Sequence, residues 1–135
     1  MIINQNIDND LIKINECPKK ILLAEDDKIN IFLMERLLIP LKFELVLAQN
    51  GEEAVEKFQQ STFDLILMDL YMPIMDGFEA TKKIRALSNT PPIIVISAAR
   101  LDETLLKQEI GNDYFMSKPL EVIKFKILLN KIFNI

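Results

Sequence analysis

Short apolar runs alternate with longer amphipathic stretches along most of the chain. Runs rich in Ile, Leu, Val and Phe are typical of strands, and they cover residues 20–25, 43–48, 63–69, 92–97 and 113–117. The stretches between them predict helices over residues 28–38, from 51 onward, 77–87, 102–110 and 119–133. Pro40 ends the first helix, Asn50 can cap the second, and Pro119 is expected to be the first residue of the last.

This alternation of strand and helix predicts the fold class. Strands joined through helices form right-handed βαβ units, which make the strands parallel and cover both faces of the sheet. The runs at 20–25, 63–69 and 92–97 are nearly continuous Ile, Leu and Val, as in central strands, whereas 43–48 alternates more and suits an edge. We therefore predict an α/β protein: a doubly wound, five-stranded parallel sheet in the order 2-1-3-4-5, flavodoxin-like, with helices on both faces.

Residues 1–18 differ in character from the rest of the chain. They are polar, rich in Asn and Asp, with scattered Ile and Leu. We expect them to form an extension or linker, with room for a short helix around residues 11–14. Residues 19–135 are expected to form one folded domain, which is large enough for a single core.

Polar side chains follow the strand runs at their carboxyl ends. Glu25 and Asp26 follow the first run, Asp69 and Ser97 end the third and fourth, and Lys118 follows the fifth. The carboxyl ends of parallel strands meet at one edge of the sheet, where ligands bind. Clustered carboxylates repel one another unless a cation compensates, and Mg²⁺ prefers such oxygen ligands. With a lysine and a hydroxyl beside them, they predict a Mg²⁺-dependent phosphoryl site whose nucleophile is a carboxylate.

Composition removes several other kinds of chemistry. The chain has no histidine and one cysteine, which excludes Ser-His-Asp triads, His–metal sites, zinc sites and Fe–S clusters on this chain. The net charge of −4 argues against a nucleic-acid surface. No run is long enough to span a membrane and no signal-peptide pattern is present, so we expect a cytoplasmic protein.

Four segments together are similar to a known family. ILLAEDDKIN, DLILMDLYMPIMDGFEAT, IIVISA and YFMSKPL resemble, in this order, the receiver domain of two-component response regulators, above all the receivers of hybrid sensor histidine kinases. The resemblance covers the chain from residue 19 onward. It implies a signalling domain rather than an enzyme, with only weak self-phosphorylation and autodephosphorylation. The expected function is phosphorelay signal transduction: a partner histidine kinase or histidine phosphotransfer domain supplies the phosphoryl group from a phosphohistidine.

The resemblance also implies a role for each residue of the metal site. Asp69 would be the phosphoacceptor and, with Asp26, a direct ligand of Mg²⁺. Glu25 would hold a metal-bound water, and the backbone carbonyl of Tyr71 would complete the protein ligands. Asp27, in contrast, is expected to serve only the start of the first helix.

Further implied roles concern the phosphoryl group and the signal. Lys118 would contact the phosphoryl group, and its bond to Pro119 would be cis. Ser97 would move toward the phosphoryl group after transfer, and Phe115 would be the aromatic switch residue. The face formed by residues 102–110, 113–117 and 119–133 could then bind a downstream protein, or a second copy of the chain as a homodimer.

Two positions are expected to set the lifetime of the phosphorylated form. Tyr71, two residues after Asp69, and Ala99, two residues after Ser97, would flank the path of an attacking water. Neither side chain offers a carboxylate or amide that could orient that water. We therefore predict slow autodephosphorylation.

Two other functions would suit an α/β fold, but the sequence fits each of them less well than it fits a receiver. An aspartyl-phosphate phosphatase or phosphotransferase of the haloacid-dehalogenase type needs a second Asp two residues after the nucleophile, in a loop after the first strand. Here that position is Tyr71, and Asp69 ends the third strand. A flavodoxin-like cofactor binder needs Ser, Thr or Gly in the loop after the first strand, which instead reads Glu-Asp-Asp.

Overall fold

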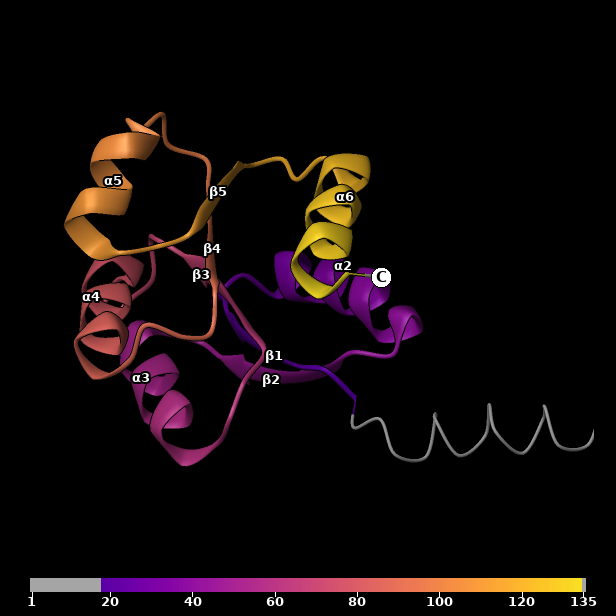
Figure 1. Cartoon of the computed structure of the whole chain (residues 1–135), viewed down its shortest axis with the longest axis horizontal. Coiled ribbons are helices and arrows are strands. Elements are labelled where there is room, and N and C mark those ends of the chain that lie inside the picture. The colour runs from indigo at the N-terminus through magenta and orange to yellow at the C-terminus, as the bar shows by residue number, and fades with distance from the viewer. Residues whose placement is uncertain (1–17, 135) are drawn as a thin grey trace, which may run out of the picture.

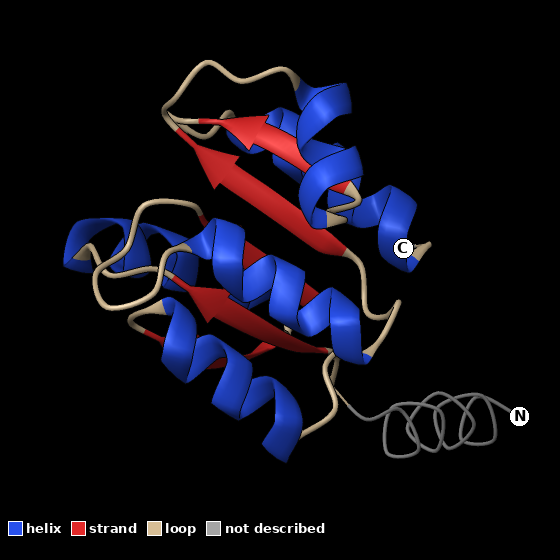
Figure 2. Ribbon diagram, turned by 90° about the vertical axis from the view of Figure 1, so that its left-hand side faces the viewer, coloured by secondary structure: helices blue, strands red, loops and turns tan. Residues whose placement is uncertain are grey.

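The computed structural model describes residues 18–134, so the expectations for residues 1–17 lie outside the described part. One parallel sheet has the strand order β2-β1-β3-β4-β5, which confirms the predicted topology (Figure 1). Every strand pair in the sheet is parallel, and the arrowheads visible in Figure 2 point the same way. The strands are β1 (Lys20–Ala24), β2 (Glu44–Ala48), β3 (Leu65–Asp69), β4 (Ile93–Ser97) and β5 (Tyr114–Ser117).

Helices cover both faces of the sheet. Figure 1 shows α3, α4 and α5 on one face and α2 and α6 on the other. A short 3₁₀ turn, η1 (Ile39–Leu41), follows α2. The helices are α2 (Lys28–Leu38), α3 (Gly51–Gln60), α4 (Gly77–Leu87), α5 (Glu103–Ile110) and α6 (Val122–Phe133). Within residues 18–134, none of them is long and apolar enough to cross a membrane.

Alternate residues of each strand build two separate apolar cores. Leu22 and Ile66 belong to the core beneath α3, α4 and α5, whereas Ile21 and Leu65 belong to the core beneath α2 and α6. Burying one such side chain contributes about 1.5–3 kcal/mol. Because the central strands are buried on both faces, their ends are held firmly at the edge where the polar residues lie.

Polar caps fix where the helices begin at that edge. Asn50 caps α3 as predicted, because its Oδ1 accepts a hydrogen bond from the backbone N–H of Glu53 at 2.8 Å. Asp27 caps α2 by accepting from the N–H of Ile29 at 2.7 Å, which confirms its structural role. Each cap satisfies a backbone N–H that the first turn of a helix leaves unpaired.

The last helix begins later than the sequence predicted. The expectation was a start at Pro119, but α6 begins at Val122 with Glu121 at the N-cap position. The Lys118–Pro119 peptide bond is cis, as the resemblance implied. Leu120 packs against the core beneath α2 and α6, so residues 119–121 form a loop rather than a helical turn. Proline's fixed φ suits both conformations, which is why the prediction was wrong here.

Candidate metal and phosphoacceptor site

The register of the sheet brings the polar residues to one level. Ala24 of β1 pairs with Met68 of β3, so the next residues, Glu25 and Asp69, lie beside each other. On the other side of β3, Asp69 pairs with Ile96, one residue before Ser97. Three neighbouring strands thus deliver two carboxylates and a hydroxyl to the same edge.

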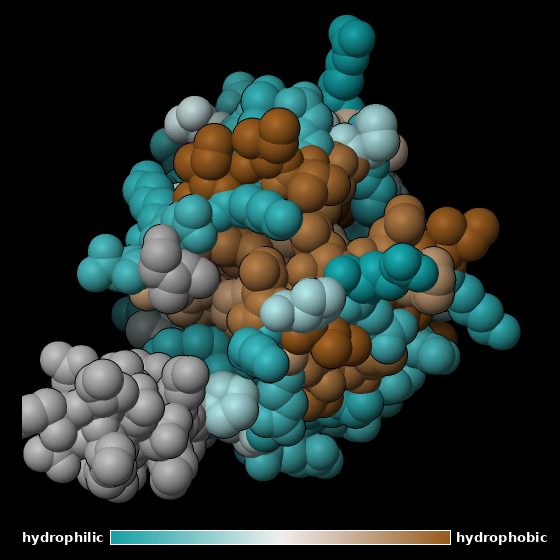
Figure 3. Space-filling model, turned by 90° about the vertical axis from the view of Figure 1, so that its right-hand side faces the viewer, coloured by the Kyte–Doolittle hydropathy of each residue, from teal (hydrophilic) through white to brown (hydrophobic). Residues whose placement is uncertain are grey.

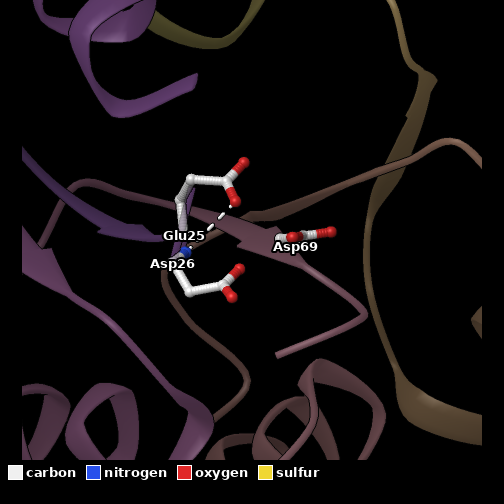
Figure 4. Close-up of side chains that lie close together, drawn as sticks. All are labelled: Glu25, Asp26 and Asp69. Atoms are coloured by element: carbon white, nitrogen blue, oxygen red, sulfur yellow. Dashed lines mark hydrogen bonds between the residues drawn. The ribbon is translucent and has the colours of Figure 1, made fainter. Parts of the chain in front are cut away.

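Three carboxylates form a cluster at this edge. Glu25, Asp26 and Asp69 each offer an oxygen, and these oxygens all lie within 4.8 Å of one another. Figure 4 shows Glu25 and Asp26 at the end of β1 and Asp69 on the neighbouring strand. Glu25 and Asp69 are buried, whereas Asp26 is exposed. An oxygen cluster open to solvent on one side suits Mg²⁺, which binds a few carboxylates and keeps several waters.

Lys118 lies against this cluster. Its Nζ is 2.9 Å from Oε1 of Glu25 and 3.5 Å from Oδ2 of Asp69. The other oxygen of Glu25, Oε2, accepts from the backbone N–H of Asp26 at 3.1 Å, the dashed line in Figure 4. The sequence predicted a lysine beside the carboxylates, but it did not predict that Lys118 lies closer to Glu25 than to Asp69. Lys118 therefore offsets the charge of both buried carboxylates.

Burial and like charge change how these groups titrate. Burial, together with the negative charge of Glu25, raises the pKa of Asp69 from its ordinary value of 3.8 to about 6, although Lys118 opposes the shift. For Lys118, burial favours the neutral form, but the hydrogen bond and charge of Glu25 and the charge of Asp69 outweigh it and raise its pKa. A cation at the cluster would relieve the repulsion that raises the pKa of Asp69. The residues present thus fit a divalent metal.

A tight approach of α4 fixes the loop after β3. A Cβ built on Gly77 would lie 2.1 Å from the carbonyl oxygen of Asp69, so only glycine fits at the start of this helix. The N–H of Gly77 donates to the carbonyl of Leu70 at 2.8 Å. Tyr71, between these points, is 56% exposed and its ring meets that of Phe78 edge-on at 5.9 Å. The role of the Tyr71 carbonyl as a metal ligand stays a prediction.

The two expected switch residues lie on adjacent strands. Ser97 is fully buried at the end of β4, and its Oγ accepts from the N–H of Ala99 at 3.2 Å. Phe115 of β5 pairs with Val95 in the sheet and packs, half-buried, against the core beneath α3, α4 and α5. Their movement on phosphorylation stays a prediction.

One feature beside the site was not foreseen from the sequence. A cavity of about 250 Å³ opens between α2 and the start of α6. Apolar side chains line most of it, among them Leu33, Met34 and Leu120, and it reaches Asp69 and Lys118 at one end. The signal was available: the α2 and α6 segments, KINIFLMERLL and VIKFKILLNKIF, are apolar around most of their circumference.

Known proteins with similar sequences are response regulators and hybrid histidine kinases. The chain is 38% identical over 120 residues to the two-component response regulator ORR41 of Oryza sativa subsp. japonica, covering 83% of this chain and 92% of that protein. It is 36% identical over 118 residues to the hybrid signal transduction histidine kinase G of Dictyostelium discoideum. That match covers 83% of this chain but 3% of the kinase, so the chain spans a small part of such relatives.

Solved structures and the family model agree with these relatives. The receiver domain of the sensor histidine kinase PA1611 from Pseudomonas aeruginosa PAO1, solved with a magnesium ion in its active site cleft, is similar with a TM-score of 0.79 and 29% identity. The similarity covers 88% of this chain and all of that one. Residues 21–130 match the family model described as the response regulator receiver domain. The chain therefore belongs to the response regulator receiver domain family of two-component signal transduction.

Proposed function

We propose that this receiver accepts a phosphoryl group on Asp69 from a phosphohistidine of a partner histidine kinase or histidine phosphotransfer domain. The observation that carries the proposal is the position of Asp69. Its carboxylate ends a central strand, lies within 4.8 Å of two other carboxylate groups, and has the Lys118 ammonium 3.5 Å away. Asp69 would thus be a nucleophile with the positive charge of Lys118 on one side and, on the other, a carboxylate cluster that could hold a metal ion.

The transfer requires no acid or base from a histidine of this chain. A carboxylate oxygen of Asp69 attacks the phosphorus of the donor, and the new P–O bond forms as the P–N bond breaks. The electron pair of the P–N bond returns to the imidazole nitrogen of the partner. Lys118 can bind the oxygens of the phosphoryl group and balance their charge, which is the main contribution a protein makes to phosphoryl transfer.

Mg²⁺ is the cofactor that the cluster supports best. Asp26 and Asp69 would bind it directly, Glu25 through a water, and Tyr71 through its backbone carbonyl. When bound, it would neutralise charge on the carboxylates and on the phosphoryl oxygens. Glu25 is held for this task by Lys118 and by the N–H of Asp26.

The signal would leave the site through Ser97 and Phe115. Ser97 can offer its hydroxyl to a phosphoryl oxygen, and Phe115 can follow by changing its packing. The output face would consist of α5, β5 and α6, where Leu105 and Val122 are exposed while Leu106 and Phe125 are core residues. It would bind a downstream protein, pass the phosphoryl group on, or form a homodimer. We place these events in the cytoplasm, with residues 1–18 as an extension of the receiver.

Neither alternative function has comparable support. A haloacid-dehalogenase type enzyme needs a general acid two residues after the nucleophile, but Tyr71 stands there with its ring exposed. A flavodoxin-like binder would place phosphate at the end of β1, where Glu25 and Asp26 present negative charge.

The test is labelling by acetyl phosphate, followed by intact mass. With Mg²⁺, the wild type should gain one phosphoryl group as acetate leaves, and Asp69→Asn should gain none. Asp76→Asn is the matched control, because Asp76 is an exposed helix cap in the following loop and asparagine caps equally well. Equal labelling of the Asp69→Asn variant and the wild type would place the acceptor elsewhere and refute the proposal.

A further inference from the structure

The outer faces of α2 and α6 are unusually apolar for surface helices. On α2, Ile29 and Leu33 are 70% and 57% exposed, and on α6, Ile123 and Ile127 are 76% and 62% exposed. Figure 3, which views this side of the molecule, shows apolar patches on both sides of a hollow that is itself lined by apolar atoms. Contiguous apolar surface of this kind usually marks a site that another segment covers.

The hollow corresponds to the cavity beside the phosphoacceptor site. Its floor consists of strand residues such as Leu23, Leu67 and Ile96, and its walls come from α2 and the segment leading into α6. With the exposed side chains above it, it forms a groove between the two helices. We call this the α2–α6 groove. Asp69 and Lys118 line it at one end.

The helices beside the groove are basic, although the chain as a whole carries a net charge of −4. The α6 segment contains three lysines and no acidic residue. The α2 segment contains one lysine and one arginine against a single glutamate. A segment that combines aliphatic side chains with acidic ones would therefore match the groove in both hydrophobicity and charge.

Residues 1–17 have this composition. They contain six Ile and Leu residues, and their acidic residues Asp8, Asp10 and Glu16 outnumber the single Lys13. Four of the aliphatic residues, at positions 3, 7, 11 and 14, have the spacing that places side chains on one face of a helix.

The attachment point also suits the groove. The segment joins the fold at Pro18, directly before β1 begins at Lys20. In a parallel α/β sheet the strands begin at the edge where the covering helices end, so the segment starts near the ends of α2 and α6. Seventeen residues span about 25 Å as a helix, whereas the eleven residues of α2 span about 16 Å. The segment can thus run back along the groove to the edge where Asp69 lies.

We propose that residues 2–14 dock into the α2–α6 groove, with their Ile and Leu side chains on its apolar floor and their acidic residues toward the lysines of α6. Covalent attachment favours this occupant over a separate molecule, because a short tether gives an effective concentration of about millimolar.

Paramagnetic relaxation in the full chain tests the docking. A nitroxide is attached at Asn9→Cys in a Cys17→Ser background, and amide signals are recorded by NMR. We expect the amides of α2 and α6 to lose intensity and those of α3 and α4, on the opposite face, to keep it. Adding Ile7→Asp and Leu11→Asp should restore the lost signals, whereas the control pair Asn4→Asp and Asn6→Asp, with the same added charge, should not.

Three outcomes would overturn the proposal. Signals on α2 and α6 that keep their intensity would show that the groove is not covered by this segment. Losses spread equally over both faces would show an extension without a docking site. Losses that arise only between molecules, in a mixture of nitroxide-labelled and isotope-labelled protein, would assign the groove to a second copy. Because no phosphoryl chemistry enters this readout, its failure is distinguishable from a failure of Asp69 labelling.

Discussion

At the scale of single residues, the chemistry of Asp69 depends on neighbours that act in opposite directions. Burial and the charge of Glu25 favour the protonated acid, whereas Lys118 favours the carboxylate. Without metal, the pKa of Asp69 is therefore about 6. A bound cation would compete with that proton, so metal binding and protonation of Asp69 should oppose each other.

The raised pKa of Asp69 predicts how stability depends on pH without metal. Between pH 3.8 and about 6 the folded protein holds a proton on Asp69 that the unfolded chain has lost, so stability falls as the pH rises through this window. Asp69→Asn cannot titrate there. In chelator, its free energy of unfolding relative to wild type should therefore rise by about 2–3 kcal/mol between pH 4 and pH 7. Urea unfolding at each pH measures this difference.

Magnesium provides the control for this prediction. At pH 7, Mg²⁺ should stabilise the wild type through mass action and stabilise Asp69→Asn much less. If the free energy of unfolding depended on pH in the same way for the wild type and Asp69→Asn in chelator, Asp69 would not have the raised pKa, and the prediction would be contradicted.

The residues beside the acceptor predict a long-lived phosphorylated form. Tyr71 and Ala99 carry no group that could orient water toward the phosphorus. The double variant Tyr71→Asn, Ala99→Glu introduces an amide and a carboxylate, and should shorten the half-life by about tenfold or more, within the range that positioned acid–base groups contribute. Decay of the phosphorylated mass over time measures it. Equal half-lives for the wild type and the double variant would show that these two positions do not control the lifetime of the phosphorylated form.

Much of the candidate site was predictable because each of its residues ends a recognisable strand or comes soon after one. The register of β1 and β3 then brings Glu25 and Asp69 together without further information. That Lys118 contacts both carboxylates, and Glu25 more closely than Asp69, was not predictable. The distances from its Nζ to the two carboxylates differ by less than 1 Å. Sequence spacing does not determine distances at that level.

At the scale of elements, one arginine joins three parts of the fold that lie away from the site. The guanidinium of Arg85, on α4, donates to the carbonyl of Gly111 at 2.8 Å and to that of Pro91 at 2.6 Å. It also pairs with the Asp113 carboxylate at 2.7 Å, just before β5. These bonds connect α4 to the turn after α5 and to the loop before β4, and so hold β5 in register.

Loss of these bonds should destabilise the protein measurably. Arg85→Met keeps the aliphatic stem but removes the guanidinium donor from three carbonyls, those of Ser88, Pro91 and Gly111. The Asp113 carboxylate keeps only the N–H of Ile93, so the change should cost about 2–3 kcal/mol of unfolding free energy. Lys83→Met is the matched control: its pairing with Glu79, at 3.6 Å, is exposed on the same helix and should contribute no more than about 0.5 kcal/mol. Chemical denaturation compares the two. Similar losses for both variants would contradict the role of Arg85.

Element types and order were predicted well, while some boundaries were not. The central strands were identified because helices cover both of their faces, so that nearly all of their residues, such as Ile66 and Ile94, are buried and apolar. The start of α6 was missed because a loop after a cis proline and a first helical turn have the same local sequence signal. The exposed apolar surface of α2 and α6 was missed for another reason. Both segments are apolar around most of their circumference, but the sequence does not say which apolar residues, such as Ile123, stay outside the core.

At the scale of the whole molecule, two cores on a doubly covered sheet hold a polar site at one edge. The core beneath α3, α4 and α5 includes Phe115 at its margin. The opposite face carries the apolar α2–α6 groove, which Asp69 lines at one end.

The most direct test of the account is to locate the phosphoryl group on the chain. Protein labelled with acetyl phosphate is reduced with borohydride, which converts an aspartyl phosphate to homoserine, and the digested peptides are sequenced by mass spectrometry. Homoserine is expected at position 69 when Mg²⁺ is present, and little or none is expected in chelator. Homoserine at position 26, or labelling that does not depend on Mg²⁺, would contradict it.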